Sequence, residues 1–151
     1  MQPLVTYRGT VYPWQCDHVG HMNITWYANK FDEANWNLFA LAGLTPRYLR
    51  ESGRGMAALE QRIAYRRELV AGDIVEVESR LLEVRPKVLR FVHEMREGEG
   101  GVVAAVCEIV AAHVDRRLRR ACEIEPHVRA IAERLAAEGA SAAAGSGGPA
   151  A

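Results

Sequence analysis

The stretch NITWYANKFDEANWNLFALAG, residues 23–43, decides the fold, because the rest of the chain is arranged around it. Its apolar side chains recur every three or four positions, at Tyr27, Phe31, Ala34, Leu38 and Leu41. Polar residues fall mostly between them, which is the pattern of an amphipathic helix with one buried face. Either Asn23 or Thr25 suits the N-cap of this helix, and Gly43 suits its C-terminal end. The sequence therefore predicts one long helix of about 18 residues, roughly 27 Å in length.

Downstream of this helix the period of the sequence changes to two. Apolar and charged residues alternate in three runs, residues 56–69, 75–81 and 89–95. Each run has the pattern of a strand with one buried face. A fourth run, residues 102–114, is apolar on both faces apart from Glu108 and His113, which indicates a strand covered on both sides. Four consecutive strands are therefore expected after the helix.

The two ends of the chain complete the predicted order of elements. VTYRGTVYP, residues 5–13, reads as a first strand, and EPHVRAIAERLAAE, residues 125–138, reads as a short closing helix. Runs of consecutive strands indicate an antiparallel sheet with segregated helices, the α+β class. Five strands spaced about 4.8 Å apart are nearly as wide as the long helix is long. We therefore expect that helix to fill the concave face of a five-stranded antiparallel sheet.

Length and composition indicate a single domain. The 151 residues are enough to bury roughly two thirds of the surface that the unfolded chain exposes. After Glu138 the sequence GASAAAGSGGPAA has too little apolar bulk to offset the entropy of ordering it. We expect one domain over residues 1–138 and a disordered tail over residues 139–151.

Charge and cysteine content restrict the partners. Nineteen basic and nineteen acidic residues cancel, so no general attraction to nucleic acid or to an anionic membrane is expected. No apolar run approaches the roughly 20 residues of a membrane span, and the first ten residues lack the features of a signal peptide. Three cysteines, Cys16, Cys107 and Cys122, suggest no disulfide framework. We expect a cytoplasmic protein with reduced thiols.

The apolar strand over residues 102–114 also bears on assembly. Such a strand near a sheet edge invites a strand or helix of a second chain. Most assemblies of identical chains have closed symmetry. A homodimer, or a homotetramer built as a dimer of dimers, is therefore expected.

The segment CDHVGHMN, residues 16–23, gathers a thiol, a carboxylate, two imidazoles, a glycine and a carboxamide. A metal site would use the thiol and both imidazoles, but a fourth ligand is missing, and we expect no metal. In a plain turn, Asp17 and Asn23 would be turn and cap residues. In a third interpretation Asp17 faces the free N–H groups at the start of the helix. A carboxylate beside a helix N-terminus that can hold an oxyanion is suited to acyl transfer.

The longer segment WQCDHVGHMNITWY, residues 14–27, resembles the D-x-x-G-H-x-N-N-x-x-Y motif of the hotdog-fold acyl-CoA thioesterases of the 4-hydroxybenzoyl-CoA thioesterase family. AGLTP, RIAYRRELVAGD and HVD agree in place, so the resemblance covers roughly residues 5–128. It implies a hotdog fold and the hydrolysis of an acyl-CoA thioester to free acid and coenzyme A, without a cofactor. Gln15 and Ile24 depart from the pattern, since many relatives have an acidic residue and a second asparagine there.

The resemblance also implies roles for individual residues. Asp17 would act as nucleophile or general base, and the backbone amide of Ile24 or a close neighbour would polarise the thioester carbonyl. Gly20 would let the backbone approach the thioester closely, or serve as a plain turn glycine. The hydroxyl of Tyr27 would lie near the acyl group, unless Tyr27 is a core aromatic whose hydroxyl finds another partner.

Further candidates surround this motif. His21 and Asn23 would brace the loop or cap the helix, with direct substrate contact as the alternative. Trp14 and Trp26 would wall an acyl pocket for an aromatic or quaternary-ammonium group, unless they are core or interface aromatics.

Two sets of charged residues are also candidates. The cluster that follows the last strand would bind the phosphates of coenzyme A, or merely increase solubility; it comprises Arg116, Arg117, Arg119 and Arg120. Arg85 and Lys87 form a second candidate patch. Glu33 and Glu60 are rival carboxylates, ranked below Asp17 because each also suits a solvated face.

Other functions stay open at the level of sequence. The substrate carrier is either coenzyme A or an acyl carrier protein. Hotdog folds also serve as dehydratases and hydratases, because a fold does not fix a reaction. A non-catalytic acyl-CoA-binding protein is a further alternative, and it would bind the ligand without turnover.

Overall fold

The computed structural model describes residues 3–98 and 101–145. Helix α1, Ile24–Leu41, has 18 residues, as predicted from the apolar period. Asn23 is its N-cap, because the Asn23 side chain accepts a hydrogen bond from the Thr25 N–H. Gly43 follows the helix with a φ of +94°, a backbone conformation that favours glycine. The local signals in the sequence thus fix both ends of α1.

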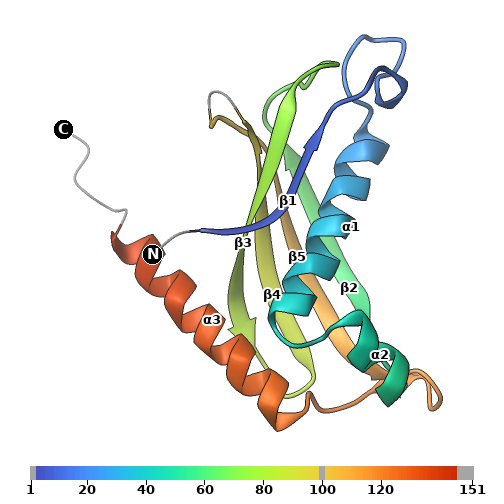
Figure 1. The fold of residues 1–151 in the computed structure, drawn as a ribbon, viewed down its shortest axis with the longest axis vertical. Coiled ribbons are helices and arrows are strands. Elements are labelled where there is room, and N and C mark those ends of the chain that lie inside the picture. The colour runs from blue at the N-terminus through green and yellow to red at the C-terminus, as the bar shows by residue number, and fades with distance from the viewer. Residues whose placement is uncertain (1–2, 99–100, 146–151) are drawn as a thin grey trace.

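Six strands form one antiparallel sheet (Figure 1). They are β1 (Leu4–Thr10), β2 (Arg54–Tyr65), β3 (Ile74–Val84), β4 (Val88–Glu97), β5 (Val103–Asp115) and β6 (Arg120–Ala121). The strand order is β1-β3-β4-β5-β2, and β6 pairs with β5. The five long strands confirm the predicted sheet, and β6 is a two-residue addition that the sequence did not reveal.

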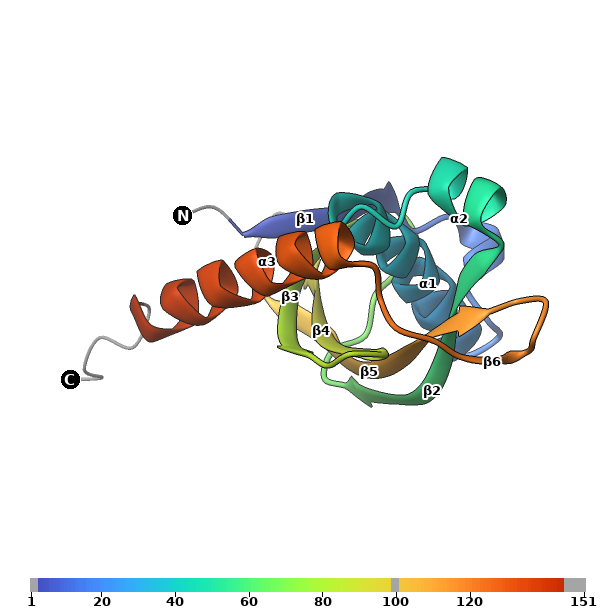
Figure 2. The ribbon, with the colours of Figure 1, turned by 90° about the horizontal axis from the view of Figure 1, so that it is seen from below.

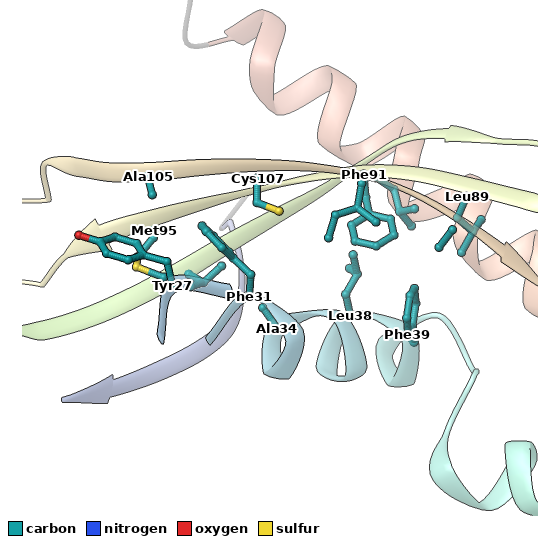
Figure 3. Close-up of a cluster of buried hydrophobic side chains, with 14 of the residues drawn as sticks. Tyr27, Phe31, Ala34, Leu38, Phe39, Leu89, Phe91, Met95, Ala105 and Cys107 are labelled. Carbon is teal, nitrogen blue, oxygen red and sulfur yellow. The ribbon is translucent and has the colours of Figure 1, made fainter. Parts of the chain in front are cut away.

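Helix α1 lies against the concave face of this sheet, which is the hotdog arrangement. Phe31, Leu38 and Phe39 point from α1 toward the strands, where they meet Phe91 and other buried side chains (Figure 3). The rings of Phe39 and Phe91 are 5.5 Å apart and nearly perpendicular. Strand β5 presents small side chains here, among them Ala105, which leaves room for the aromatic residues of the helix.

A line of polar side chains crosses this core. The hydroxyl of Ser79 on β3 lies 2.6 Å from Nδ1 of His93 on β4. Nε2 of His93 lies 2.7 Å from Oδ1 of Asn35 on α1. His93 is fully buried, and burial lowers the pKa of its imidazole to about 4. A neutral ring with both nitrogens hydrogen-bonded therefore links two strands to the central helix.

Strand β2 is a free edge of the sheet. Its register against β5 shifts between Ala58 and Glu60, which marks a β-bulge. The sequence predicted Leu59 on the buried face, but the bulge re-aims it and its exposed fraction is 64%. From Ala58 to Glu68 nearly every residue is exposed. One side of the concave sheet is thus open.

Besides α1 and a short 3-10 helix, Pro13–Gln15, the described residues contain two further helices. Helix α2, Pro46–Ser52, was not predicted, although Thr45 caps it and Gly53 ends it in a left-handed conformation. Helix α3, Pro126–Gly145, packs along β3 and continues past the edge of the sheet (Figure 2). Residues 139–145 were expected in a disordered tail but continue α3, because alanine-rich sequence favours helix. The rest of that expected tail lies outside the described residues. In the described ranges no helix is both long and apolar enough to cross a bilayer.

Candidate active site

The loop before α1 is a compact structure held by backbone hydrogen bonds. The Asp17 N–H donates to the His21 carbonyl at 3.0 Å, and the Gly20 N–H donates to the Asp17 carbonyl at 3.0 Å. Gly20 has a φ of +94°, and a Cβ atom there would meet no atom within 4 Å. The backbone conformation of Gly20 therefore favours glycine, although there is space for a Cβ atom. The Met22 N–H donates to the Leu69 carbonyl at 2.7 Å, which ties the loop to the segment after β2.

The carboxylate of Asp17 is held by two hydrogen bonds. Oδ1 accepts from the Val19 N–H at 2.9 Å, and Oδ2 accepts from Nδ2 of Asn23 at 3.0 Å. Asn23 Oδ1 in turn accepts from the backbone N–H and the hydroxyl of Thr25. The hydrogen bond from Asn23, followed by that from Val19, holds the pKa of Asp17 below its ordinary value. Asp17 is therefore anionic at neutral pH and is oriented by the cap of α1.

The backbone N–H of Ile24, in the first turn of α1, is the amide that this cap does not bind. The Thr25 N–H is bound by the Asn23 side chain, and the Trp26 N–H donates to the Asn23 carbonyl at 3.0 Å. The first N–H groups of a helix have no acceptor within it. Ile24, the first helical residue, has an exposed side chain and lines the groove beside Asp17.

An open groove of about 780 Å³ runs beside this loop. Four of the predicted site residues line it: Asp17, His21, Ile24 and Tyr27. The rest of its lining comprises Val19, Met22, Tyr65, Arg66, Arg67, Glu68 and Val70. Most of these follow β2, and Nε2 of His21 lies 3.0 Å from a carboxylate oxygen of Glu68. The groove thus lies between the loop and the segment that leaves the free edge strand.

Of the two interpretations offered for Tyr27, its surroundings match that of a core aromatic whose hydroxyl finds another partner. Its ring is buried, with an exposed fraction of 4%, and meets the ring of Tyr65 edge-on at 5.1 Å. Its hydroxyl donates to the Arg67 carbonyl at 3.1 Å. Tyr27 therefore supports the wall of the groove and fixes the backbone of Arg67.

The two tryptophans that were predicted to wall the pocket lie elsewhere. Trp14 is 67% exposed and stacks on Tyr12 at a ring distance of 4.5 Å. Trp26 is half-buried and packs against the core. Neither is among the described residues that line the groove. The aromatic rings of the groove are instead those of Tyr27 and Tyr65.

The predicted arginine cluster lies at the opposite end of the sheet within one chain. Tyr65, in the groove, is opposite Ala105, whereas Arg54 is opposite Asp115. Ten residues of β5 separate these pairs, a distance of about 33 Å. Arg116, Arg117, Arg119 and Arg120 follow Asp115 and so lie at the far end (Figure 1). Arg85, Lys87, Glu33 and Glu60 do not line the groove either.

Arg66 and Arg67 are two cationic residues among the groove residues that sequence reasoning missed. They stand in the segment RIAYRRELVAGD, which marked the resemblance, but nothing in the linear sequence relates them to Asp17. Their place in the groove depends on the pairing of β2 with β5, because the Arg66 and Arg67 N–H groups donate to the Ala104 carbonyl. In the described part of the chain, no group of three or more His, Cys, Asp or Glu side chains is arranged to hold a metal ion.

Comparison with solved structures places this fold among thioesterases. A Staphylococcus aureus protein in complex with CoA has a TM-score of 0.84 and 20% identity, over 91% of this chain and 87% of that chain. A Pseudomonas putida KT2440 protein assigned as a thioesterase has a TM-score of 0.80 and 25% identity, over 99% and 92%. A 1,4-dihydroxy-2-naphthoyl-CoA thioesterase from Synechocystis has a TM-score of 0.76 and 14% identity, over 87% and 96%.

Comparison at the level of sequence gives the family. No curated protein matches the chain. The profile of the thioesterase-like superfamily matches residues 11–132, which include the loop, α1 and the four long strands β2 to β5. The chain belongs to the thioesterase-like superfamily.

Proposed function

We propose that the protein is an acyl-CoA thioesterase that uses Asp17. The observation that carries the proposal is the Asp17 carboxylate, held in its anionic form beside the first turn of α1 and lining the groove. An anionic carboxylate either attacks an electrophilic carbon or takes a proton from a water that attacks. Membership of the thioesterase-like superfamily and the CoA complex of the Staphylococcus aureus relative support a CoA thioester as the electrophile.

The reaction follows from the position of the two groups. The Asp17 carboxylate attacks the thioester carbonyl carbon, or activates a water that does so. The Ile24 N–H donates to the oxyanion that develops, and the positive end of the α1 dipole favours that charge. The carbon–sulfur bond breaks, and the coenzyme A thiolate takes up a proton. Water supplies the second oxygen of the free acid.

Arg66 and Arg67 are the proposed contacts for the phosphates of coenzyme A. Both guanidinium groups belong to residues that line the groove, and the backbone of Arg67 is fixed by the Tyr27 hydroxyl. Arginine binds phosphate through paired N–H donors. In this assignment they take the role that was predicted for Arg116, Arg117 and Arg119.

A homodimer through β2 is the proposed assembly, alone or as half of a tetramer. The strand is 12 residues long, pairs with no other described strand on its outer edge, and leads directly into the groove. An unpaired edge of this length invites another strand. Antiparallel pairing of β2 with its own copy would set the Arg54 end of one strand beside the Tyr65 end of the other. The arginine cluster of one chain would then approach the groove of the second chain.

Thiol release tests the enzymatic proposal. A panel of acyl-CoA thioesters is incubated with the wild-type protein and with Asp17→Asn, and the free thiol is followed with a disulfide dye. Asp32→Asn is the matched control, because Asp32 is an exposed aspartate on α1. We expect turnover by the wild-type and control proteins and its loss in Asp17→Asn. Equal activity of all three proteins would contradict the role of Asp17, and an inactive wild-type protein would contradict acyl-CoA as substrate.

A further inference from the structure

A cluster of ionisable side chains lies at the end of the sheet opposite the groove, where the proposed hydrolysis does not use it. Tyr48 comes from α2, Arg54 from the start of β2, His113 and Asp115 from the end of β5, and Cys122 from the residue after β6. Cys122 is partly exposed, whereas His113 is fully buried. Side chains from α2, β2 and β5 thus gather around the segment that carries Cys122.

His113 presents an N–H group to the sulfur of Cys122. Nδ1 of His113 lies 3.1 Å from the Cys122 carbonyl oxygen, which can only accept, so Nδ1 carries the hydrogen. The same Nδ1 lies 3.4 Å from Cys122 Sγ. Nε2 faces the Tyr48 hydroxyl at 3.4 Å, and burial lowers the pKa of the imidazole. The neutral ring is therefore fixed in the tautomer that donates toward the thiol.

Arg54 adds a positive charge to the same sulfur. Nη1 of Arg54 donates to Oδ2 of Asp115 at 2.5 Å, which anchors the guanidinium group. The pKa of Arg54 is raised, with the nearby Cys122 as the largest cause and the hydrogen bond to Asp115 as a smaller one. A hydrogen-bond donor and a cation beside sulfur both stabilise negative charge that develops on it during a reaction.

The other two cysteines have different surroundings. Cys16 is also partly exposed, but its sulfur lies 3.9 Å from the Tyr12 carbonyl oxygen, which offers it no donor. Cys107 is buried in the core, and burial raises the pKa of its thiol to about 12. Cys122 therefore combines exposure, an N–H donor and a guanidinium group, whereas Cys16 offers a matched comparison at similar exposure.

We propose that Cys122 is an oxidant-sensitive thiol that reacts with hydroperoxides to form a sulfenic acid. The sulfur attacks one peroxide oxygen, a sulfur–oxygen bond forms, and the oxygen–oxygen bond breaks. Sulfur is oxidised by two electrons, and the departing hydroxide, or the alkoxide of an organic hydroperoxide, takes the thiol proton and leaves as water or alcohol. His113 and Arg54 stabilise the negative charge that develops on sulfur as its proton is lost and the sulfur–oxygen bond forms. This inference does not depend on the proposed thioesterase activity.

Trapping of the sulfenic acid tests the proposal. The reduced full-length protein is exposed to hydrogen peroxide in the presence of dimedone, which adds to sulfenic acids, and is then digested with trypsin. The three cysteines fall on separate tryptic peptides, residues 9–30, 97–116 and 121–129. Mass spectrometry should show labelling at Cys122 about tenfold faster than at Cys16, with none at Cys107. Equal labelling rates at Cys122 and Cys16 would overturn the proposal.

Variants of the neighbouring residues separate this effect from exposure alone. Arg54→Gln and His113→Gln should each slow labelling of Cys122, and Arg54→Lys should retain it because the positive charge remains. Arg62→Gln is the matched control, since Arg62 lies on the same strand and pairs with Glu108 away from the thiol. Circular dichroism checks that each variant is folded. Unchanged labelling in Arg54→Gln, a partly exposed position, would overturn the role of the cluster even if His113→Gln failed to fold.

Discussion

The side-chain amide of Asn23 donates a hydrogen bond to Oδ2 of Asp17 at 3.0 Å, while its carbonyl oxygen caps α1 through Thr25. One side chain therefore orients the candidate catalytic carboxylate and begins the central helix. Asn23 is thus the largest cause of the lowered pKa of Asp17, ahead of the Val19 N–H, and it also sets the geometry of the first helical turn.

Asn23→Ala should raise the pH at which activity is lost on acidification. The Asn23 amide holds the pKa of Asp17 below its ordinary value, so its removal lets the carboxylate take up a proton at higher pH. Loss of the cap should also lower the free energy of unfolding by about 1 kcal/mol. The pH dependence of thiol release and urea denaturation measure the two effects. Asn29→Ala, at an exposed position of α1, should change neither.

The double variant Arg66→Gln and Arg67→Gln should raise KM for an acyl-CoA by about tenfold, because charge-assisted contacts to phosphate would be lost. The value of kcat should change much less, since neither side chain is assigned to the reacting carbon. An acyl-pantetheine thioester lacks the nucleotide, so its KM should be unaffected. Arg62→Gln, an 80% exposed arginine on β2, controls for charge. An equal rise of KM for both thioesters would argue against phosphate binding.

The stability of the protein should fall between pH 6.5 and pH 4 because of His93. Its folded pKa of about 4 lies below the ordinary 6.5, so in this interval the unfolded chain binds the proton and the folded chain does not. The free energy of unfolding should therefore decrease by about 3 kcal/mol as the pH is lowered across the interval. Denaturation at a series of pH values measures it.

His93→Leu separates this contribution from that of the carboxylates. The variant should lose part of the pH dependence, and it should also be less stable at pH 7 because Ser79 and Asn35 lose a buried partner. His127→Gln is the control, because that imidazole is 63% exposed. A pH dependence that is the same in wild-type protein and His93→Leu would show that another group titrates.

Leu59→Lys should convert the proposed dimer to a monomer. Leu59 is 64% exposed at the bulge of β2, so a lysine there costs the isolated chain little. Near the middle of a symmetric β2 pair, however, the two lysines would face each other and repel. Light scattering coupled to size-exclusion chromatography gives the mass. Val5→Lys, at an exposed position of the opposite edge strand, should leave the mass unchanged, and a dimer that survives Leu59→Lys would exclude β2 as its interface.

Local signals were enough to predict α1 and the five long strands, but not α2 or β6. The spacing of Phe31, Leu38 and their neighbours gave the length and buried face of α1, and Asn23 gave its start. The alternating pattern wrongly put Leu59 on the buried face, because a β-bulge adds a residue to the strand that the pattern does not reveal. Composition likewise misjudged residues 139–145, where low apolar content was taken for disorder although alanine favours helix.

The candidate site was only partly accessible from sequence. Asp17, His21 and Ile24 are close in the chain, so a motif could gather them. Arg66 and Arg67 reach the groove through strand pairing between residues far apart in sequence. Arg116 and its neighbours were predicted to bind phosphates because they follow the last long strand, and within one chain strand direction puts that end away from Asp17, so the prediction stays open for an assembly of two chains.

The division of volume between α1 and β5 has a consequence for the diversity of acyl groups. Tyr27 supplies a large ring at one end of the core, while Ala105 on the facing strand supplies a single methyl group (Figure 3). Tyr65 is paired with Ala105 and contacts Tyr27, and both tyrosines line the groove. Exchanging sizes between helix and strand would keep the total volume nearly constant, which protein cores tolerate best. A protein engineer could therefore reshape this wall of the groove by compensating pairs at these positions, leaving the loop that carries Asp17 untouched.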